Sequence, residues 1–172
     1  RTASAWSPVL VLNANAPQPL NSPKFTDESE RGWDAAGFSP EGERVVTTHR
    51  HCKHAVVWNA TTGKRIATYE GQHRIMSFEW SPDGSRVAVG TSGAGAKAIV
   101  FDPSTGLEIL SIDGETFTAA EGVAFSGDGK RLATWSDQGS SGGGTVRNAT
   151  SGAAITTWRT GERHSAGDWM NP

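Results

Sequence analysis

The side chains with the most reactive chemistry lie close together, where residues 49–54 read HRHCKH. Imidazole and thiolate groups are the ligands that zinc and copper prefer. The candidate ligands are His49, His51, Cys52 and His54. Along a hairpin, alternate side chains point to opposite sides, so one tight hairpin cannot easily enclose an ion with all four. We predict no metal site, and an exposed interaction loop made of His49, Arg50, His51, Cys52, Lys53 and His54.

A catalytic cysteine is the second chemistry that this segment suggests. The cationic neighbours Arg50 and Lys53 would lower the pKa of the Cys52 thiol and raise its reactivity. A catalytic pair is defined by geometry, however, and closeness in sequence does not create one. The glycine-rich runs 90–97 and 139–144 lack the spacing and following helix of a phosphate-binding loop. The sequence also contains no H-E-x-x-H or C-x-x-C motif and no G-x-S-x-G elbow that joins a strand to a helix, so we predict no catalytic residue, no cofactor and no enzyme activity.

The elements that position this loop come from an internal repeat. Residues 38–48 read FSPEGERVVTT, residues 80–90 read WSPDGSRVAVG and residues 125–135 read FSGDGKRLATW. The first aromatic residues of these copies are 42 and 45 residues apart. Weaker copies begin at Trp6 and Trp169. Each copy predicts a tight turn at its glycine, followed by a half-buried strand.

A second motif follows each copy of the first. Residues 55–64 read AVVWNATTGK, residues 98–107 read AIVFDPSTGL and residues 145–152 read TVRNATSG. Each predicts a strand, a turn and another strand, so one period holds four short strands. The sequons at Asn59 and Asn148 fall in these turns, and turn chemistry explains both without glycosylation. A lone four-stranded sheet cannot bury both of its faces, so the units must stack on one another.

This repeat resembles that of the WD-repeat β-propellers. Trp58-Asn59 and Phe101-Asp102 stand where that family has its Trp-Asp pair, and Gly71-Gln72-His73 resembles its Gly-His element. The resemblance implies an all-β propeller of four-stranded antiparallel blades, with about four blades in this chain. It covers residues 33–172, whereas residues 1–32 form a divergent segment or a partial blade. Asn replaces Asp in some pairs, so the family's Asp–His–Ser–Trp network is incomplete and is not assigned.

The length of the chain bears on its assembly and function. Seven blades of about 42 residues would need close to 300, so 172 residues resemble part of a larger ring. The resemblance implies a non-catalytic scaffold for protein partners, as a subunit or fragment of a larger assembly. Open strand edges would need a second chain or further blades to cover them. The alternative is a periplasmic or hydrolase-associated propeller, because its W-S-P-D-G-S-R repeat is similar to residues 80–86. Such a domain would gate or recruit for an enzyme, or bind a ligand or metal through residues 49–54.

Charge and hydropathy exclude other classes of function. The 16 basic and 18 acidic residues give a net charge of −2, which argues against a general nucleic-acid binder. Residues 44–74 carry a net +5 and residues 76–128 a net −6, which predicts neighbouring blades of opposite charge. Apolar runs fall far short of the roughly 18 residues that a membrane span needs. The single cysteine leaves the cellular compartment open.

The aromatic residues predict the packing between blades. We expect the following to be core residues: Phe38, Phe78, Trp80, Phe101 and Phe125. In the last repeat Arg147-Asn148 replaces the aromatic pair, which predicts an irregular segment over residues 140–148. We expect Trp135 or Trp158 to be buried there in compensation. The alternative for these two, and for Trp33, is a role at an interface.

Overall fold

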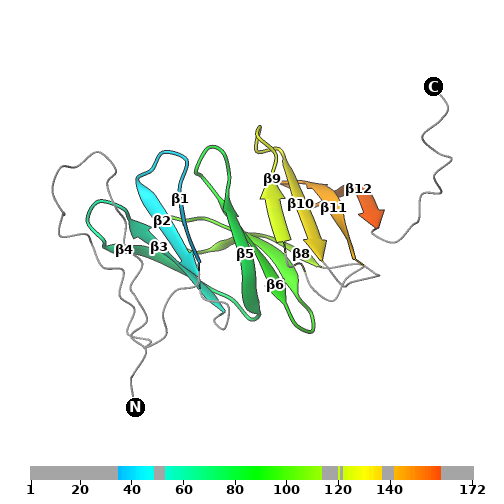
Figure 1. Cartoon of the computed structure of the whole chain (residues 1–172), viewed down its shortest axis with the longest axis horizontal. Helices are drawn as coiled ribbons and strands as arrows, with labels where there is room; N and C mark the ends of the chain where they lie inside the picture. Colours follow the sequence, from blue (N-terminus) through cyan, green and yellow to red (C-terminus); the bar gives the residue numbers. More distant parts are fainter. Residues whose placement is uncertain (1–34, 49–52, 114–119, 121, 137–141, 160–172) are drawn as a thin grey trace, which may run out of the picture.

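The structure is a computed structural model that describes residues 35–48, 53–113, 120, 122–136 and 142–159. These residues form β-strands and turns without a helix, so none of them belongs to a helix that could cross a membrane. The strands make three four-stranded antiparallel sheets, which we call blades 1, 2 and 3 (Figure 1). The predicted all-β architecture of four-stranded antiparallel blades is confirmed.

Each blade is a meander of neighbouring strands. Blade 1 contains β1 (Ala35–Phe38), β2 (Arg44–Thr48), β3 (His54–Asn59) and β4 (Arg65–Glu70). Blade 2 contains β5 (Arg74–Trp80), β6 (Val87–Ser92), β7 (Lys97–Phe101) and β8 (Glu108–Asp113). Blade 3 contains β9 (Gly122–Phe125), β10 (Arg131–Ser136), β11 (Gly143–Asn148) and β12 (Ala154–Arg159). The blades follow one another in chain order across Figure 1. The prediction of about four blades cannot be compared beyond these three, because the repeat copies at Trp6 and Trp169 and the boundary at residue 33 lie outside the described residues.

A serine hydroxyl fixes the first turn of every blade. In blade 2, Ser81 Oγ accepts a hydrogen bond from the Arg86 amide at 2.9 Å and donates one to the Arg86 carbonyl at 3.1 Å. The same pair of bonds recurs in the other two blades, between Ser39 and Arg44 and between Ser126 and Arg131. The repeated Ser of the sequence motif is therefore explained by this turn geometry, which involves only the backbone of the arginine.

An Asn or Asp side chain fixes the second turn. Asn59 Oδ1 accepts hydrogen bonds from the amides of Thr61 and Thr62, at 3.1 and 2.8 Å. Asn148 Oδ1 does the same in blade 3, and Asp102 Oδ1 accepts from the Ser104 amide in blade 2. This geometry confirms that turn chemistry accounts for the asparagines of both sequons.

The hydrophobic core lies between blades. One cluster joins blades 1 and 2 and includes Val46, Val57, Tyr69, Ile75, Trp80, Val89 and Phe101. A second cluster joins blades 2 and 3 and includes Ala88, Val100, Ile112, Val123 and Leu132. The central sheet therefore buries both faces, which is why its β6 strand has an unbroken run of buried residues.

The predicted aromatic core is only partly correct. Trp80 and Phe101 are 7% and 0% exposed, and Phe78 and Phe125 pack against the clusters. Phe38 is 51% exposed, so its predicted burial is wrong. Trp80 and Phe125, at the same repeat position, pack against the preceding blade. Phe38 belongs to the first described blade and has no described blade before it.

The prediction of an irregular last repeat is also wrong where it can be checked. Residues 143–148 form β11, which pairs with β10 along its whole length and with β12 from Gly143 to Arg147, with one register shift between Val146 and Arg147. Arg147 is 7% exposed and donates from Nη1 to the Gly152 carbonyl at 3.2 Å. The arginine that stands in place of the aromatic residue therefore hydrogen-bonds to the turn that follows its own strand. Residue 142 precedes the strand, and residues 140 and 141 of the predicted segment lie outside the described residues.

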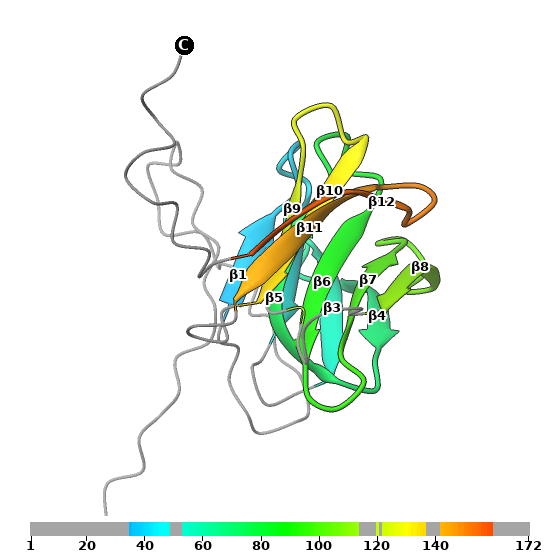
Figure 2. The ribbon, with the colours of Figure 1, turned by 90° about the vertical axis from the view of Figure 1, so that its right-hand side faces the viewer.

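The two tryptophans of blade 3 do not compensate by burial, because Trp135 is 40% and Trp158 is 41% exposed. In the sheet register a row of Gly122, Trp135, Gly144 and Trp158 crosses the blade from β9 to β12. Directly paired residues of an antiparallel sheet share one face. The indole rings occupy the space where a side chain on each glycine would lie. Figure 2 shows blade 3 from the side facing away from blade 2.

Two turn glycines with the same backbone conformation give a test of blade stacking. Gly42 and Gly106 have φ of 77° and 76°. A Cβ at Gly42 meets nothing within 4 Å, whereas one at Gly106 would lie 2.1 Å from the Thr68 carbonyl oxygen of blade 1. We expect Gly42→Ala to cost about 1–2 kcal/mol of unfolding free energy from backbone strain. Gly106→Ala should cost about 1–3 kcal/mol more, because the blades must also move apart. Chemical denaturation measures both values, and equal losses would contradict this packing.

Candidate interaction surface

The loop that the sequence singles out lies where it was expected, between β2 and β3. Residues 49–52, which carry His49, Arg50, His51 and Cys52, lie outside the described residues, so their role stays a prediction. Lys53 is exposed, and its carbonyl accepts a hydrogen bond from the Gly71 amide at 2.7 Å. His54 is half-buried at the start of β3. Within the described ranges, His, Cys, Asp and Glu form no group of three that could hold a metal ion.

A polar cavity of about 230 Å³ lies between blades 1 and 2. Its lining includes Tyr69, His73, Lys97 and Glu108. Burial, followed by the charge of Glu108, raises the pKa of the Tyr69 hydroxyl to about 12, so this group stays protonated and can only hydrogen-bond. Lys97 is paired with Asp113 at 2.9 Å. The volume is below the roughly 300–1,000 Å³ of small-molecule sites, and the described lining includes no activated nucleophile.

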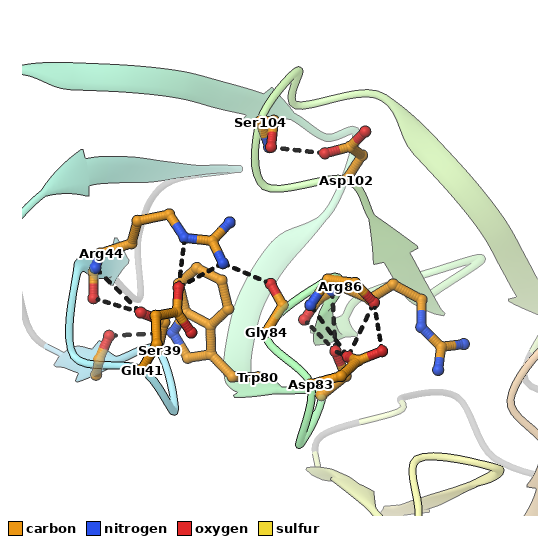
Figure 3. Close-up of polar contacts among 12 residues, drawn as sticks. Ser39, Glu41, Arg44, Trp80, Asp83, Gly84, Arg86, Asp102 and Ser104 are labelled. Atoms are coloured by element: carbon orange, nitrogen blue, oxygen red, sulfur yellow. Dashed lines mark hydrogen bonds and ion pairs between the residues drawn. The ribbon is translucent and has the colours of Figure 1, made fainter.

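The contact between blades 1 and 2 is organised by an arginine. The Arg44 guanidinium lies 5.0 Å from the ring centroid of Trp80 and donates from Nη2 to the Gly84 carbonyl at 2.8 Å (Figure 3). Glu41 holds the guanidinium in place by accepting from Nε at 2.8 Å. Trp80 in turn donates from Nε1 to the Gly37 carbonyl of blade 1 at 3.1 Å. One arginine thereby reaches two elements of the next repeat, its aromatic residue and its turn glycine.

The same contact recurs between blades 2 and 3. The Arg86 guanidinium lies 5.3 Å from the ring centroid of Phe125 and donates from Nη2 to the Gly129 carbonyl at 2.9 Å. Its Nη1 donates to the Ala149 carbonyl at 3.0 Å. We call this arrangement, seen for Arg44 and for Arg86, the arginine contact. In each arginine contact, the arginine of one repeat binds the aromatic residue and the turn glycine of the next repeat. The sequence motif shows these residue types only side by side within a single repeat.

The acidic residue of the turn orders the loop that receives the arginine. Hydrogen bonds from the Ser81 hydroxyl, at 2.6 Å, and then from Ser85 lower the pKa of the Asp83 carboxyl to about 2. In blade 3 the Ser126 hydroxyl lowers the pKa of Asp128 in the same way. Both carboxylates stay ionised at neutral pH and keep their turns rigid.

A repeated β-bulge marks the outer strand of each blade. The register between the third and fourth strands shifts by one residue in all three blades. The residue skipped by the pairing is Ile66 in β4, Ile109 in β8 and Ile155 in β12. These isoleucines are 39%, 54% and 56% exposed. A bulge re-aims a side chain and spoils an edge for further strand pairing, so each outer edge presents an apolar side chain at an equivalent place.

Comparisons with known proteins agree with this geometry. An uncharacterized WD repeat-containing protein of Deinococcus radiodurans is 28% identical over 138 residues, which are 72% of this chain and 52% of the relative. Eukaryotic translation initiation factor 3 subunit I of Pyricularia oryzae is 31% identical over 104 residues, 60% of this chain and 29% of the relative. The mouse U3 small nucleolar RNA-associated protein 18 homolog is 28% identical over 108 residues, 60% of this chain and 19% of the relative. No family model matches the chain.

Two solved structures share the fold at low sequence identity. Hydrazine synthase of Kuenenia stuttgartiensis matches 74% of this chain and 37% of its own, with a TM-score of 0.65 and 18% identity. A Bacteroides fragilis protein assigned as a 6-phosphogluconolactonase matches 75% and 39%, with a TM-score of 0.61 and 13% identity. The chain is a partial WD-repeat-like β-propeller. The propeller segment spans between 19% and 52% of the three relatives above.

Sequence reasoning missed two features of this propeller segment. The bulged isoleucines were not singled out, although each stands three residues after the glycine of the second turn. The arginine of the first motif was noted only as part of the repeat. Its recurrence beside an aromatic residue and a turn glycine was the available signal for a contact between blades.

The arginine contact can be tested within one protein, because only two of the three equivalent arginines contact the next blade among the described residues. Arg131 holds the same position in blade 3, is exposed, and makes no side-chain hydrogen bond in the described part of the chain. We expect Arg86→Ala to lower the unfolding free energy by about 2–4 kcal/mol, since it removes two charged hydrogen bonds and a cation–π contact. Arg131→Ala should change it by less than about 0.5 kcal/mol. Urea denaturation of the two variants makes the comparison, and similar losses would refute the contact.

The electrostatics of the turn give a prediction on pH. NMR titration should place the pKa of Asp83 near 2, against 3.8 for a free carboxyl. Because the folded-state pKa is lowered, Asp83 adds stability that is complete above pH 3.8 and is lost as pH falls through about 2. Ser81→Ala should return the pKa toward 3.8, since it removes the largest cause of the shift. An unchanged pKa in that variant would show that the hydroxyl does not hold the carboxylate.

Proposed function

We propose that this propeller segment is a non-catalytic scaffold that binds other proteins as part of a larger assembly. The observation that carries the proposal is the set of three equivalent bulges, which display Ile66, Ile109 and Ile155 on successive outer strands. Exposed apolar side chains repeated at equivalent sites give a partner an apolar contact on each blade. The rigid core between blades fixes the distances among these sites.

The relatives support the same class of function. Their names place them with a translation initiation factor, a small nucleolar RNA-associated protein and, in Schizosaccharomyces pombe, a poly(A)+ RNA export protein that is 38% identical over 71 residues. Such proteins work as members of assemblies. Because the chain covers only part of each relative, the relatives do not identify its own partners.

Two further observations favour binding over catalysis. The cavity between blades 1 and 2 is small, and the charge of its Lys97 is neutralised by Asp113, which lies outside the lining. The two enzyme structures that share the fold are only 18% and 13% identical to this chain, which supports the fold alone. The alternative role, in which a propeller gates or recruits for an enzyme through residues 49–54, has no specific observation in its favour.

The scaffold proposal predicts that the bulged isoleucines carry partner binding. A triple variant, Ile66→Ser, Ile109→Ser and Ile155→Ser, should fold normally, because all three side chains are exposed. Met76→Ser is the matched control, since Met76 is 47% exposed and is also skipped at a bulge, but in β5, the first strand of its blade and not the outer one. Quantitative affinity capture from the source organism should lose more than about 90% of specific partners with the triple variant, because each site removes apolar contact area. The Met76→Ser control should retain them.

Equal partner sets for the wild type, the triple variant and the control would contradict this use of the outer strands. Circular dichroism and Tm must be unchanged in the triple variant, so that any lost binding reflects the surface and not unfolding. Turnover of a phosphorylated sugar lactone by the purified protein would contradict the non-catalytic role directly.

A further inference from the structure

The polar cavity of about 230 Å³ lies on the outer side of the contact between blades 1 and 2. One wall comes from β4 and the segment that follows it, and the other comes from β6, β7 and β8 of blade 2. The described lining includes Tyr69 and Gly71 on the first wall and Lys97, Glu108 and Ser111 on the second. Two neighbouring blades that pack against each other therefore form this cavity.

The strand register turns Glu108 toward this cavity. Glu108 pairs with Phe101 across β7 and β8, and directly paired residues share one face of a sheet. The Phe101 ring stacks on the Tyr69 ring of blade 1 at a centroid distance of 5.0 Å, so that face is the one turned toward blade 1. Because Glu108 is exposed and also lines the cavity, its carboxylate can be reached from solvent.

The charge that the cavity leaves uncompensated is negative. Lys97 and Asp113 form an ion pair at 2.9 Å, so their charges cancel. The other two lining residues that are charged at neutral pH, Glu70 and Glu108, are both acidic. Among the described residues the Glu108 side chain makes no ion pair or hydrogen bond. A ligand with a positive charge therefore matches this cavity, whereas an anion would be repelled.

The opposite wall offers a neutral hydrogen-bonding group, the Tyr69 hydroxyl. Burial, followed by the charge of Glu108, raises the pKa of Tyr69 to about 12, so the hydroxyl stays protonated and its oxygen can accept a hydrogen bond. A Cβ at Gly71 would lie 3.1 Å from this hydroxyl oxygen, so the glycine keeps the space beside it open. A cation in the cavity would thus meet a carboxylate on one wall and a hydroxyl on the other.

Exposed apolar side chains stand on the same two outer strands. Ile109 lies between Glu108 and Ser111 along β8, and Ile66 lies on β4 with Tyr69. The two isoleucines are 54% and 39% exposed. The bulged isoleucines and the acidic cavity therefore belong to one surface, which we call the outer groove.

We propose that a partner protein inserts one lysine or arginine side chain into the cavity of the outer groove, with its charge on Glu108 and a neighbouring apolar residue on Ile109. This inference rests on the proposed scaffold function and names the chemistry of the partner segment. The cavity is smaller than the sites of about 300–1,000 Å³ that hold small molecules, and its size suits a single long side chain. The charge adds specificity, because apolar contacts on the isoleucines alone would accept many partners.

NMR titration of the intact chain with a defined cation tests the cavity. The probe is Nα-acetyl-arginine amide, and the matched neutral probe is Nα-acetyl-citrulline amide, which has nearly the same shape without the charge. We expect saturable binding of the arginine probe with a Kd of about 1 mM. The amide signals of Thr91 and Ser111 should shift, since both residues line the cavity. The citrulline probe should bind about fivefold more weakly or not at all. Equal binding of the two probes, or no saturable binding of the arginine probe, would overturn the proposal.

A substitution that removes only the charge of Glu108 tests where the cation binds. Glu108→Gln should weaken binding of the arginine probe by about threefold or more, because it removes the unpaired carboxylate. Glu43→Gln is the matched control, since Glu43 is an exposed acid in the first turn of blade 1 and is absent from the described lining. Equal affinities of the two variants would overturn the proposal, and unchanged circular dichroism in both excludes misfolding as the cause.

Dipeptide probes test the apolar half of the outer groove. Of Nα-acetyl-isoleucyl-arginine amide and Nα-acetyl-arginyl-isoleucine amide, at least one should bind about threefold or more tightly than the single-residue probe, because its isoleucine buries apolar surface. Ile109→Ser should remove this gain and leave the affinity for the arginine probe unchanged. A gain that survives Ile109→Ser, or no gain with either dipeptide, would contradict the placement of the apolar residue.

The same measurements separate this inference from the scaffold function on which it rests. If the arginine probe does not bind while the triple isoleucine variant still loses its partners, the cationic partner segment is wrong and the scaffold function stands. If the probes bind as expected while the triple variant keeps all of its partners, the scaffold function is wrong.

Discussion

A four-stranded sheet with two apolar faces is not stable alone in water, and the rest of this structure depends on that constraint. Blade 2 satisfies it fully, because β6 and β7 are buried on both sides by blades 1 and 3. Apolar burial does not by itself fix how neighbouring sheets are aligned. The arginine contact supplies that alignment, since a guanidinium must reach both an aromatic ring and one particular carbonyl of the next blade. Stacking thus provides the free energy, and the arginine selects the relative position of the blades.

The repeated sequence motif can be understood from this division of roles. Serine and the acidic residue shape the turn, glycine supplies its carbonyl at positive φ, and the aromatic residue provides the ring that receives the preceding blade's arginine. Each motif therefore works as an acceptor for the blade before it and a donor for the blade after it. The second turn has a separate purpose, because it leads into the bulge that exposes one isoleucine per blade. Stability is concentrated between blades, and the proposed recognition sites lie at their outer strands.

Much of the fold could be predicted from the sequence, because turns and strands are local. The spacing of the repeats, the Ser-Pro-Asp-Gly turn and the Asn59 turn all require only neighbouring residues. Contacts between blades are not local, and the errors lie there. Phe38 was expected in the core because its repeat position is buried elsewhere, but burial depends on a preceding blade that no local pattern reports. Arg147 was expected to disrupt its strand, whereas its guanidinium bonds to the Gly152 carbonyl. The bulged isoleucines escaped prediction because a one-residue register shift appears only when strands are paired.

A double-mutant cycle between Arg86 and Phe125 tests the central claim most directly. The unfolding free energies of the wild type, Arg86→Ala, Phe125→Leu and the double variant isolate the coupling between the guanidinium and the ring from the loss of either side chain. If the arginine contact aligns the blades, the coupling should be about 0.5–2 kcal/mol. The pair Arg131 and Phe125, which belong to the same blade and do not form this contact, should show coupling near zero. Additive losses for Arg86 and Phe125, with no coupling beyond that of the second pair, would contradict the claim that this interaction sets the arrangement of the blades.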